Sequence, residues 1–306
     1  MIPTYRPGEH LREALLSAKA SLEACGSPYQ LTVVDDASPD VDVKSLLGSW
    51  GMSDVDVFRR HVNGGLGNCW NTCIERARGD LIHVLHQDDL VKPRFHARMR
   101  DAALTHPQAG MIFCRTELLS SEGRRLESLE QAVEGPIEGW LERITAGQRL
   151  QCPSVVMRRE TYLTVGLFDV SLRYVIDWEM WVRVAASMSV CYVPEPLAVY
   201  RIHDAAATKG IKAAGIVTKD FALAFRRVRA VLSSAGRSDC IPNARAYAIS
   251  ASGGAIYEAE CAGNARAVAS EIWASAWGLG LWTDPAELLQ RVRRYARILM
   301  HSPRSV

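Results

Sequence analysis

Gly79-Asp-Leu-Ile-His-Val-Leu-His-Gln-Asp-Asp89 is the stretch that decides the fold of this chain. The apolar run from Leu81 to Leu85 predicts a short buried strand, and His86, Asp88 and Asp89 follow where that strand ends. Open α/β sheets bind ligands beyond the carboxyl ends of their strands. Carboxylates beside an imidazole suit a divalent cation, because hard oxygen ligands favour Mg²⁺ or Mn²⁺ over softer ions. On this stretch alone, an acidic loop that caps the next helix is the more common explanation.

The segments around this stretch alternate between strand and helix patterns, which implies parallel pairing in a doubly wound sheet. We expect strands at 2–7, 30–36, 55–59, 81–86, 110–114, 190–193 and 197–201, and an extended segment at 153–157. We expect helices at 9–24, 68–78, 139–146 and 159–164 and a further helix after Asp177. The second strand also ends in two carboxylates, Asp35 and Asp36. Asp177 is predicted to be an N-cap or first-turn residue.

The chain changes character past about residue 217. Long Ala-rich and Arg-rich stretches predict helices at 219–232, 243–261, 265–276 and 285–300, with no further strand. The predicted organisation is an α/β domain over 1–214 and a C-terminal all-helical lobe over 215–306. A homodimer through the helical lobe is a further expectation.

Composition excludes several classes of protein. With 306 residues, 48% of them hydrophobic, disorder is not expected, and a formal net charge of +2 gives no basic excess for a nucleic-acid partner. Eight cysteines without a Cys-x-x-Cys pair are typical of reduced thiols in a cytoplasmic protein. No signal peptide or transmembrane run is predicted, so any membrane contact would be peripheral, at the inner membrane face.

Five segments together resemble the inverting family 2 glycosyltransferases of the GT-A fold, from Ile2 to about His203. The segments are Ile2-Pro-Thr-Tyr5, Val33-Val-Asp-Asp-Ala-Ser38, Asn63 to Asp80, Leu85-His-Gln-Asp-Asp89 and Asp177-Trp-Glu-Met-Trp181. The resemblance implies a Rossmann-like, mostly parallel sheet flanked by helices. It also implies transfer of a sugar from a nucleoside diphosphate sugar, with UDP favoured by family frequency, to a hydroxyl of an unidentified acceptor. Polysaccharide precursors, lipid-linked saccharides or glycolipids and small natural products are all open as acceptors.

The resemblance also implies roles for individual residues. Asp177 falls where the family places its catalytic base. Asp88 is the expected ligand of a divalent cation, Mn²⁺ or Mg²⁺, and His86 and His203 are the two further candidate ligands. The residues expected to contact the donor are Pro3, Thr4, Tyr5, Asp35, Asp36, Asn63, Gly65, Asn71, Gln87 and Asp89.

The chain departs from the family pattern at four places. His86 stands where an aspartate is usual, Ile176 where an acid is usual, and Trp70 where many members carry a basic residue. The first strand is nearly missing because Met1 directly precedes Ile2, so either this strand is unusually short or the start lies inside it.

Two other functions are open on the sequence. A nucleotidyltransferase of related fold would share the strand-end carboxylates, but Arg6-Pro-Gly-Glu9 is a poor phosphate loop. A catalytically degenerate sugar-binding or scaffold protein is compatible with the changes at His86 and Ile176. A Rossmann dehydrogenase is disfavoured because no Gly-x-Gly-x-x-Gly follows the first strand.

Overall fold

The computed structural model describes residues 1–126, 133–202, 215–261, 264–280, 286, 288–289 and 292–293, with the side chains of 260 and 265 excepted. The chain forms two compact units. Unit 1 comprises Met1–Trp140, Arg149–Val170 and Ser187–His203, and unit 2 comprises Leu141–Gln148, Ser171–Ala186 and Asp204–Val306. Unit 2 therefore includes two separate segments, Leu141–Gln148 and Ser171–Ala186, that precede the C-terminal part of the chain. The division into domains at residue 214 stays a prediction.

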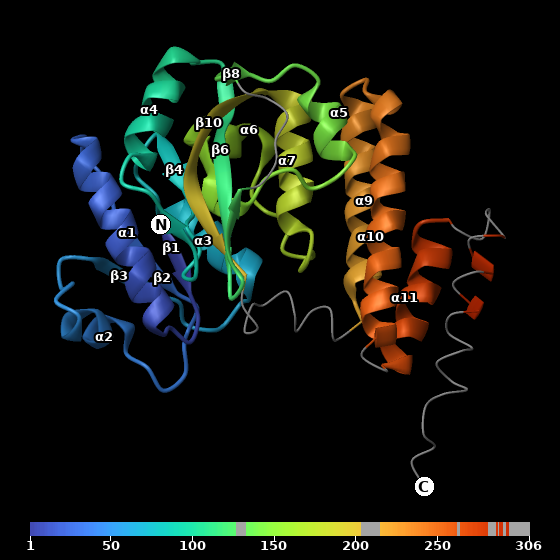
Figure 1. Ribbon diagram of the computed structural model, residues 1–306, viewed down its shortest axis with the longest axis horizontal. Coiled ribbons are helices and arrows are strands. Elements are labelled where there is room, and N and C mark those ends of the chain that lie inside the picture. The colour runs from blue at the N-terminus through green and yellow to red at the C-terminus, as the bar shows by residue number, and fades with distance from the viewer. Residues whose placement is uncertain are drawn as a thin grey trace, which may run out of the picture. The chain divides into compact units, whose positions relative to one another are not determined.

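Unit 1 begins with a three-stranded parallel sheet in the order β1 (Ile2–Thr4), β2 (Thr32–Asp35) and β3 (Asp56–Arg59) (Figure 1). The connections are the helices α1 (Glu9–Cys25) and α2 (Val43–Ser49). Helix α1 buries Leu11, Ala14, Leu15 and Ala18, which recur at helical spacing. It ends at Gly26, whose φ of +67° is costly for residues with a side chain.

A second, seven-stranded sheet completes unit 1. Its main path is β4 (Leu81–His83), β9 (Val155–Arg158), β6 (Ala109–Ser120), β10 (Ser189–Arg201) and β5 (Leu90–Val91), with β7 (Gly123–Leu126) beside β6 and β8 (Gly135–Pro136) beside β10. Two hydrogen bonds join the sheets, from Met1 N to the His83 carbonyl at 2.9 Å and from Leu85 N to the Met1 carbonyl at 3.0 Å.

The α/β fold class is confirmed. The seven-stranded sheet contains both parallel and antiparallel pairs. In the seven-stranded sheet the strands β6 and β10 pair in parallel, whereas its other pairings in the described residues are antiparallel. Short connections such as the two-residue turn from β6 to β7 produce antiparallel neighbours, whereas parallel pairing needs a long crossover. The two closing strands expected at 190–193 and 197–201 form one strand, β10, with register shifts around Pro196.

Helices cover both faces of the first sheet. Val33 packs in the cluster that contains Leu11 and Leu15 of α1, while its neighbour Val34 packs against Cys69 and Cys73 of α3 (Leu66–Arg76). Alternate strand residues face opposite sides, so α1 and α3 lie on opposite faces. Helix α4 (Phe95–Thr105) packs beside α1, and η1 (Cys152–Ser154) and α6 (Arg159–Val165) complete the unit.

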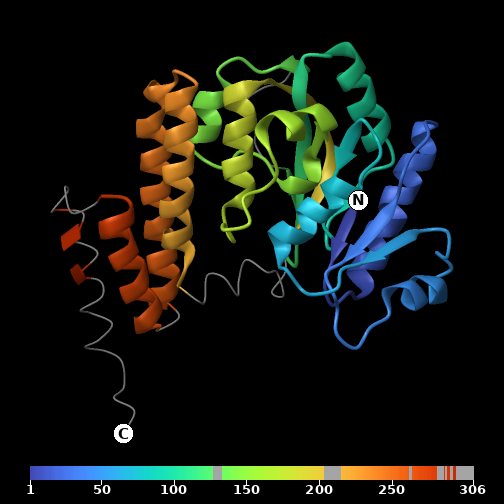
Figure 2. The ribbon, with the colours of Figure 1, turned by 180° about the vertical axis from the view of Figure 1, so that it is seen from behind.

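Unit 2 is helical where the structure describes it. Its helices are α5 (Trp140–Thr145, whose first residue belongs to unit 1), α7 (Ile176–Ser187), α9 (Val217–Ser234), η2 (Ser238–Cys240), α10 (Ile241–Cys261) and α11 (Ala265–Gly278). Helices α9, α10 and α11 lie side by side (Figures 1 and 2). Most of the helix expected at 285–300 lies outside the described residues. No helix within the described ranges combines the length and apolarity needed to cross a bilayer.

Candidate functional site

The loop after β4 carries a cluster of three metal-ligating side chains. One ligand atom each from His86, Asp88 and Asp89 lies within 4.8 Å of the others. Asp89 is 1% exposed; its Oδ1 accepts a hydrogen bond of 2.9 Å from the backbone N–H of Arg201. Its buried Oδ2 has no hydrogen-bond donor among the described residues. A buried carboxylate oxygen is costly unless it is paired, so a divalent cation fits this cluster.

The electrostatics of the loop agree with that fit. Burial, and next the charge of Asp88, raise the pKa of Asp89 well above its ordinary value, and both effects would be relieved by a bound cation. Burial lowers the pKa of His86, which favours the neutral imidazole, the form that binds metals. Its Nδ1 lies 3.6 Å from Asp89 Oδ2, and its buried Nε2 has no hydrogen-bond partner in the described part of the chain.

Arg201, at the end of β10, holds this loop in place. Besides the backbone bond to Asp89, its Nε donates to the Asp88 carbonyl at 2.9 Å, and its guanidinium pairs with Glu13 of α1. Sequence reasoning missed this residue as an anchor, since Arg201 and Asp89 are 112 residues apart.

Gln87 links the same loop to the end of β1. Its Oε1 accepts hydrogen bonds from the Thr4 hydroxyl and, at 3.3 Å, from the Tyr5 backbone N–H. Its Nε2 donates to the Tyr5 carbonyl at 3.3 Å. Thr4 is buried and Tyr5 is 39% exposed. The structure thus brings together three of the predicted donor-contacting residues, at the ends of two strands.

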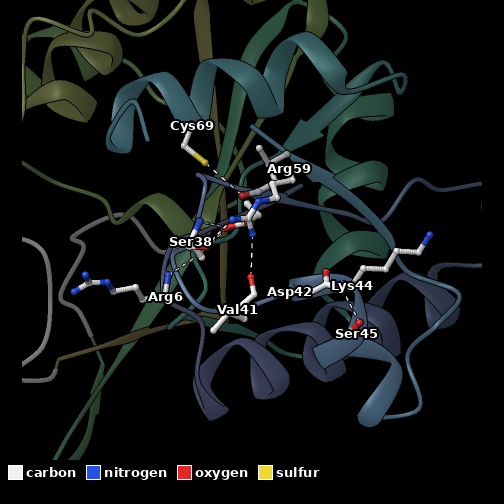
Figure 3. Close-up of polar contacts among 10 residues, drawn as sticks. Arg6, Ser38, Val41, Asp42, Lys44, Ser45, Arg59 and Cys69 are labelled. Atoms are coloured by element: carbon white, nitrogen blue, oxygen red, sulfur yellow. Dashed lines mark hydrogen bonds and ion pairs between the residues drawn. The ribbon is translucent and has the colours of Figure 1, made fainter. Parts of the chain in front are cut away.

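Asp35 is fully buried, and both of its oxygens already have partners. Oδ1 accepts from the backbone N–H and the hydroxyl of Ser38 at 3.0 and 2.6 Å, and Oδ2 accepts from Arg59 at 2.8 Å. Arg59 also donates to the carbonyls of Ser38 and Val41, and the Ser38 hydroxyl accepts from the Arg6 backbone (Figure 3). This network fixes the loop after β2.

Asp36 holds the loop before α3. Its carboxylate pairs with Arg60 and accepts the backbone N–H groups of Gly64 at 3.0 Å and Gly65 at 2.9 Å. Asn63 Oδ1 accepts from Gly65 as well, at 3.1 Å. Gly65 has a φ of +78°, a conformation that favours glycine. Donor contacts by these residues stay predictions.

Asn71 contacts another part of unit 1. Its side-chain amide donates to the Phe168 carbonyl at 2.9 Å and accepts from the Phe168 N–H at 2.9 Å. Phe168 in turn packs edge-on against Trp70, with ring centroids 4.9 Å apart. The predicted donor contact of Asn71 is untested, and the same holds for Pro3. His203 lies outside the described residues.

Asp177 belongs to unit 2, in the first turn of α7 as expected. Its Oδ2 accepts a hydrogen bond of 2.7 Å from Gln148 Nε2, and its Oδ1 accepts from the Trp178 N–H at 2.8 Å. The buried Asp220 of α9 accepts from the backbone N–H groups of residues 173, 174 and 175, which immediately precede the helix. Gln148 and Asp220 escaped the sequence analysis because neither stands in a recognisable motif.

The comparison with protein families decides what this chain is related to. The family model described as glycosyl transferase family 2 matches residues 1–156 of the 306. The chain belongs to glycosyl transferase family 2. The matched region contains β1, β2, α3 and the loop after β4 that carries His86, Asp88 and Asp89. The recognition made from the motifs is therefore confirmed.

Curated relatives of this family 2 member match along most of its length. The Mycobacterium tuberculosis protein MT1568, described as uncharacterized, is 28% identical over 230 residues, covering 67% of this chain and 66% of the relative. An uncharacterized glycosyltransferase of Rickettsia typhi, RT0329, is 26% identical over 216 residues, covering 68% and 64%. The chain therefore matches slightly less than two thirds of the length of these relatives.

Solved structures confirm the fold of this family 2 member. Two crystal structures of S. aureus TarS 1-349, one of them in complex with UDP-GlcNAc, both overlay with a TM-score of 0.67. They cover 97% of this chain and 88% of the other, at 15% and 14% identity. The mannosyltransferase PcManGT from Pyrobaculum calidifontis, in complex with GDP-Man and Mn²⁺, has a TM-score of 0.53, covers 96% and 85%, and is 16% identical. The GT-A fold is thus confirmed.

Proposed function

We propose that this protein is an inverting glycosyltransferase that moves a sugar from a nucleoside diphosphate sugar, UDP-linked, to an acceptor hydroxyl. The observation that carries the proposal is the cluster of His86, Asp88 and Asp89, with its unpaired buried oxygen, within the region that the family model matches. TarS has been crystallised with UDP-GlcNAc and PcManGT with GDP-Man and Mn²⁺, which supports a nucleotide-sugar donor and a divalent cation here.

The roles at the donor end follow from the chemistry of the leaving group. A divalent cation, when bound, stabilises the negative charge that develops on the β-phosphate as the nucleoside diphosphate departs. His86, Asp88 and Asp89 would hold that cation. Arg201 keeps the loop in place through its bonds to Asp89 and to the Asp88 carbonyl. Gln87 keeps the same loop against Thr4 and Tyr5, which we assign to the donor pocket.

Asp177 is assigned as the general base. In an inverting transfer the acceptor oxygen forms a bond to the anomeric carbon as the bond to the β-phosphate oxygen breaks, and the acceptor's proton must leave. The Asp177 carboxylate takes this proton. The hydrogen bond that Gln148 donates to this carboxylate helps to hold it in place.

Hydrolysis of the donor tests this function without knowledge of the acceptor. Wild-type protein with UDP-sugars and Mn²⁺ should release UDP slowly, since water replaces the acceptor. Asp88→Asn should abolish metal-dependent UDP binding. Asp177→Asn should keep UDP binding and lose about 10² to 10⁴ in rate. Wild-type protein that binds a UDP-sugar without ever hydrolysing or transferring it would identify a sugar-binding scaffold instead.

The acceptor, a cytoplasmic location, peripheral membrane contact and a homodimer stay predictions. The acceptors we propose to screen are lipid-linked saccharides, polysaccharide precursors and small natural products. Each carries a free hydroxyl, which is the group that the assigned base requires.

A further inference from the structure

We propose that a stack of Phe168, Trp70 and His86 delivers an imidazole ligand to the carboxylates after β4, so that the site prefers Mn²⁺ over Mg²⁺. This inference rests on the proposed function and deepens it. Two departures from the family pattern, His86 and Trp70, form a single contact in the structure. Their rings stack with centroids 4.8 Å apart and planes inclined by 23°.

The Trp70 side of the stack is rigidly supported. Trp70 is 3% exposed on α3, and its other ring neighbour is Phe168, at 4.9 Å and 68°. Asn71, the next residue along the helix, fixes Phe168 through both its backbone N–H and its carbonyl at 2.9 Å each. Two neighbouring residues of α3 therefore contact Phe168, Trp70 through its ring and Asn71 through hydrogen bonds. A buried aromatic stack of this kind restricts the orientation of the imidazole ring.

His86 also lies beside the carboxylates of the loop. Its Nδ1 lies 3.6 Å from Asp89 Oδ2, and within the described residues neither that oxygen nor His86 Nε2 has a hydrogen-bond partner. Asp89 is 1% exposed, so water does not readily replace the missing partner. One ligand atom each from His86, Asp88 and Asp89 lies within 4.8 Å of the others, so an imidazole nitrogen and two carboxylates form a mixed donor set for one cation.

The donor set determines which cation is preferred. Mg²⁺ favours oxygen ligands in a strict octahedron and keeps several of its waters. Imidazole is a ligand of transition-metal ions, whereas Mg²⁺ takes oxygen ligands, so an imidazole added to carboxylates disfavours Mg²⁺ more than Mn²⁺. A site built from aspartates alone would discriminate less between Mn²⁺ and Mg²⁺. Replacing the usual aspartate by His86 therefore shifts the preference toward Mn²⁺.

Pulsed EPR of Mn²⁺ bound to the full chain with UDP tests this ligand directly. Wild-type protein should show ¹⁴N coupling from a directly bound imidazole, and His86→Asp should lose it. Calorimetry of UDP binding in Mn²⁺ and in Mg²⁺ should show that the ratio of the two affinities falls about tenfold in His86→Asp. Trp70→Leu should weaken Mn²⁺ binding by about 10-fold, as losses of supporting residues around metals typically do, and Trp70→Phe should restore most of it.

Two control variants make the outcome decisive. His106→Asn, which alters a histidine of unit 1 outside the cluster, should leave both readouts unchanged. Nitrogen coupling that survives in His86→Asp and disappears in His203→Asn would overturn the proposal, because the imidazole ligand would then be His203. UDP binding with an unchanged affinity ratio in His86→Asp would overturn this inference alone. Absence of UDP binding to the wild-type protein with either ion would contradict the proposed function itself.

Discussion

The Asp220 carboxylate accepts a hydrogen bond of 2.7 Å from the backbone N–H of Tyr174, the shortest of its bonds to the segment before α7. Asp220 also accepts from Val175 at 3.0 Å, and Asp177 follows two residues later. Helix α9 is fixed in turn, because the buried Glu271 of α11 accepts the N–H groups of Val217 and Thr218 at 2.9 and 2.7 Å. Two buried carboxylates thus position the turn that carries the assigned base.

Asp220→Asn should reduce the rate of donor hydrolysis about tenfold while UDP affinity stays unchanged. The Asn side chain has one acceptor oxygen, and its NH₂ group would face backbone N–H groups that the Asp220 carboxylate now accepts. The loss of these hydrogen bonds should also lower the free energy of unfolding by about 1–3 kcal/mol. Calorimetry, initial rates and urea unfolding measure the three quantities. Asp239→Asn, at a carboxylate whose side chain is 60% exposed in the same unit, is the matched control. Equal rates in Asp220→Asn and wild type would remove Asp220 from the positioning of Asp177.

Gln148→Glu should move the acidic limb of the pH–rate profile to higher pH. A carboxylate at the position of the Gln148 amide, which lies 2.7 Å from Asp177 Oδ2, disfavours the ionised base and so raises its pKa. The base then requires a higher pH to be deprotonated. Gln148→Met, which removes the donor without adding a charge, should shift the limb less. Identical limbs in Gln148→Glu and wild type would mean that another group governs the profile.

Arg201→Met should weaken metal-dependent UDP binding about tenfold. It removes the hydrogen bond from Nε to the Asp88 carbonyl and the ion pair with Glu13, and a hydrogen bond made by a charged group is worth about 1.5–3 kcal/mol. Among the described residues Glu13 reaches this loop through Arg201, so Glu13→Gln should reproduce part of the loss. Calorimetry with UDP and Mn²⁺ measures both variants. Full affinity in Glu13→Gln together with a large loss in Arg201→Met would indicate that Arg201 binds the diphosphate itself.

His96→Asn should make the protein less sensitive to acid. Burial lowers the pKa of His96 to about 3, while a histidine in the unfolded chain titrates near 6.5. Between these values the unfolded state binds more protons, so stability falls as the pH falls from about 6.5 toward 3. One such histidine contributes at most about 1.4 kcal/mol per pH unit. Urea unfolding at pH 7 and pH 5 should show a smaller difference for His96→Asn, and an equal difference would contradict this assignment.

The local elements were predictable because their causes are local. The spacing of Leu11, Ala14, Leu15 and Ala18 indicates α1, and the carboxylates at the ends of two strands indicate the ligand edge of the sheet. The mixed pairing of the second sheet was not predictable, because it depends on which distant strands meet. A strand pattern carries no information about the direction of its neighbour.

The supporting residues of the candidate site escaped prediction for the same reason. Trp70 and His86 are 16 positions apart on different elements, so their stacking, and with it the link between two departures from the family pattern, is visible only in the fold. Arg201 and Asp220 reach residues more than 40 positions away. Motif spacing selected the side chains to which we assign chemical roles, while the buried partners that hold them have no fixed spacing.

Calorimetric titration of UDP into the wild-type protein and into Asp88→Asn, each with and without Mn²⁺, tests the donor-binding role most directly. We predict binding to the wild-type protein that depends on Mn²⁺ and is lost in Asp88→Asn. Equal binding to both proteins, or no binding of UDP or of any other nucleoside diphosphate to the wild type, would contradict the assignment of this site as the donor site of a glycosyltransferase.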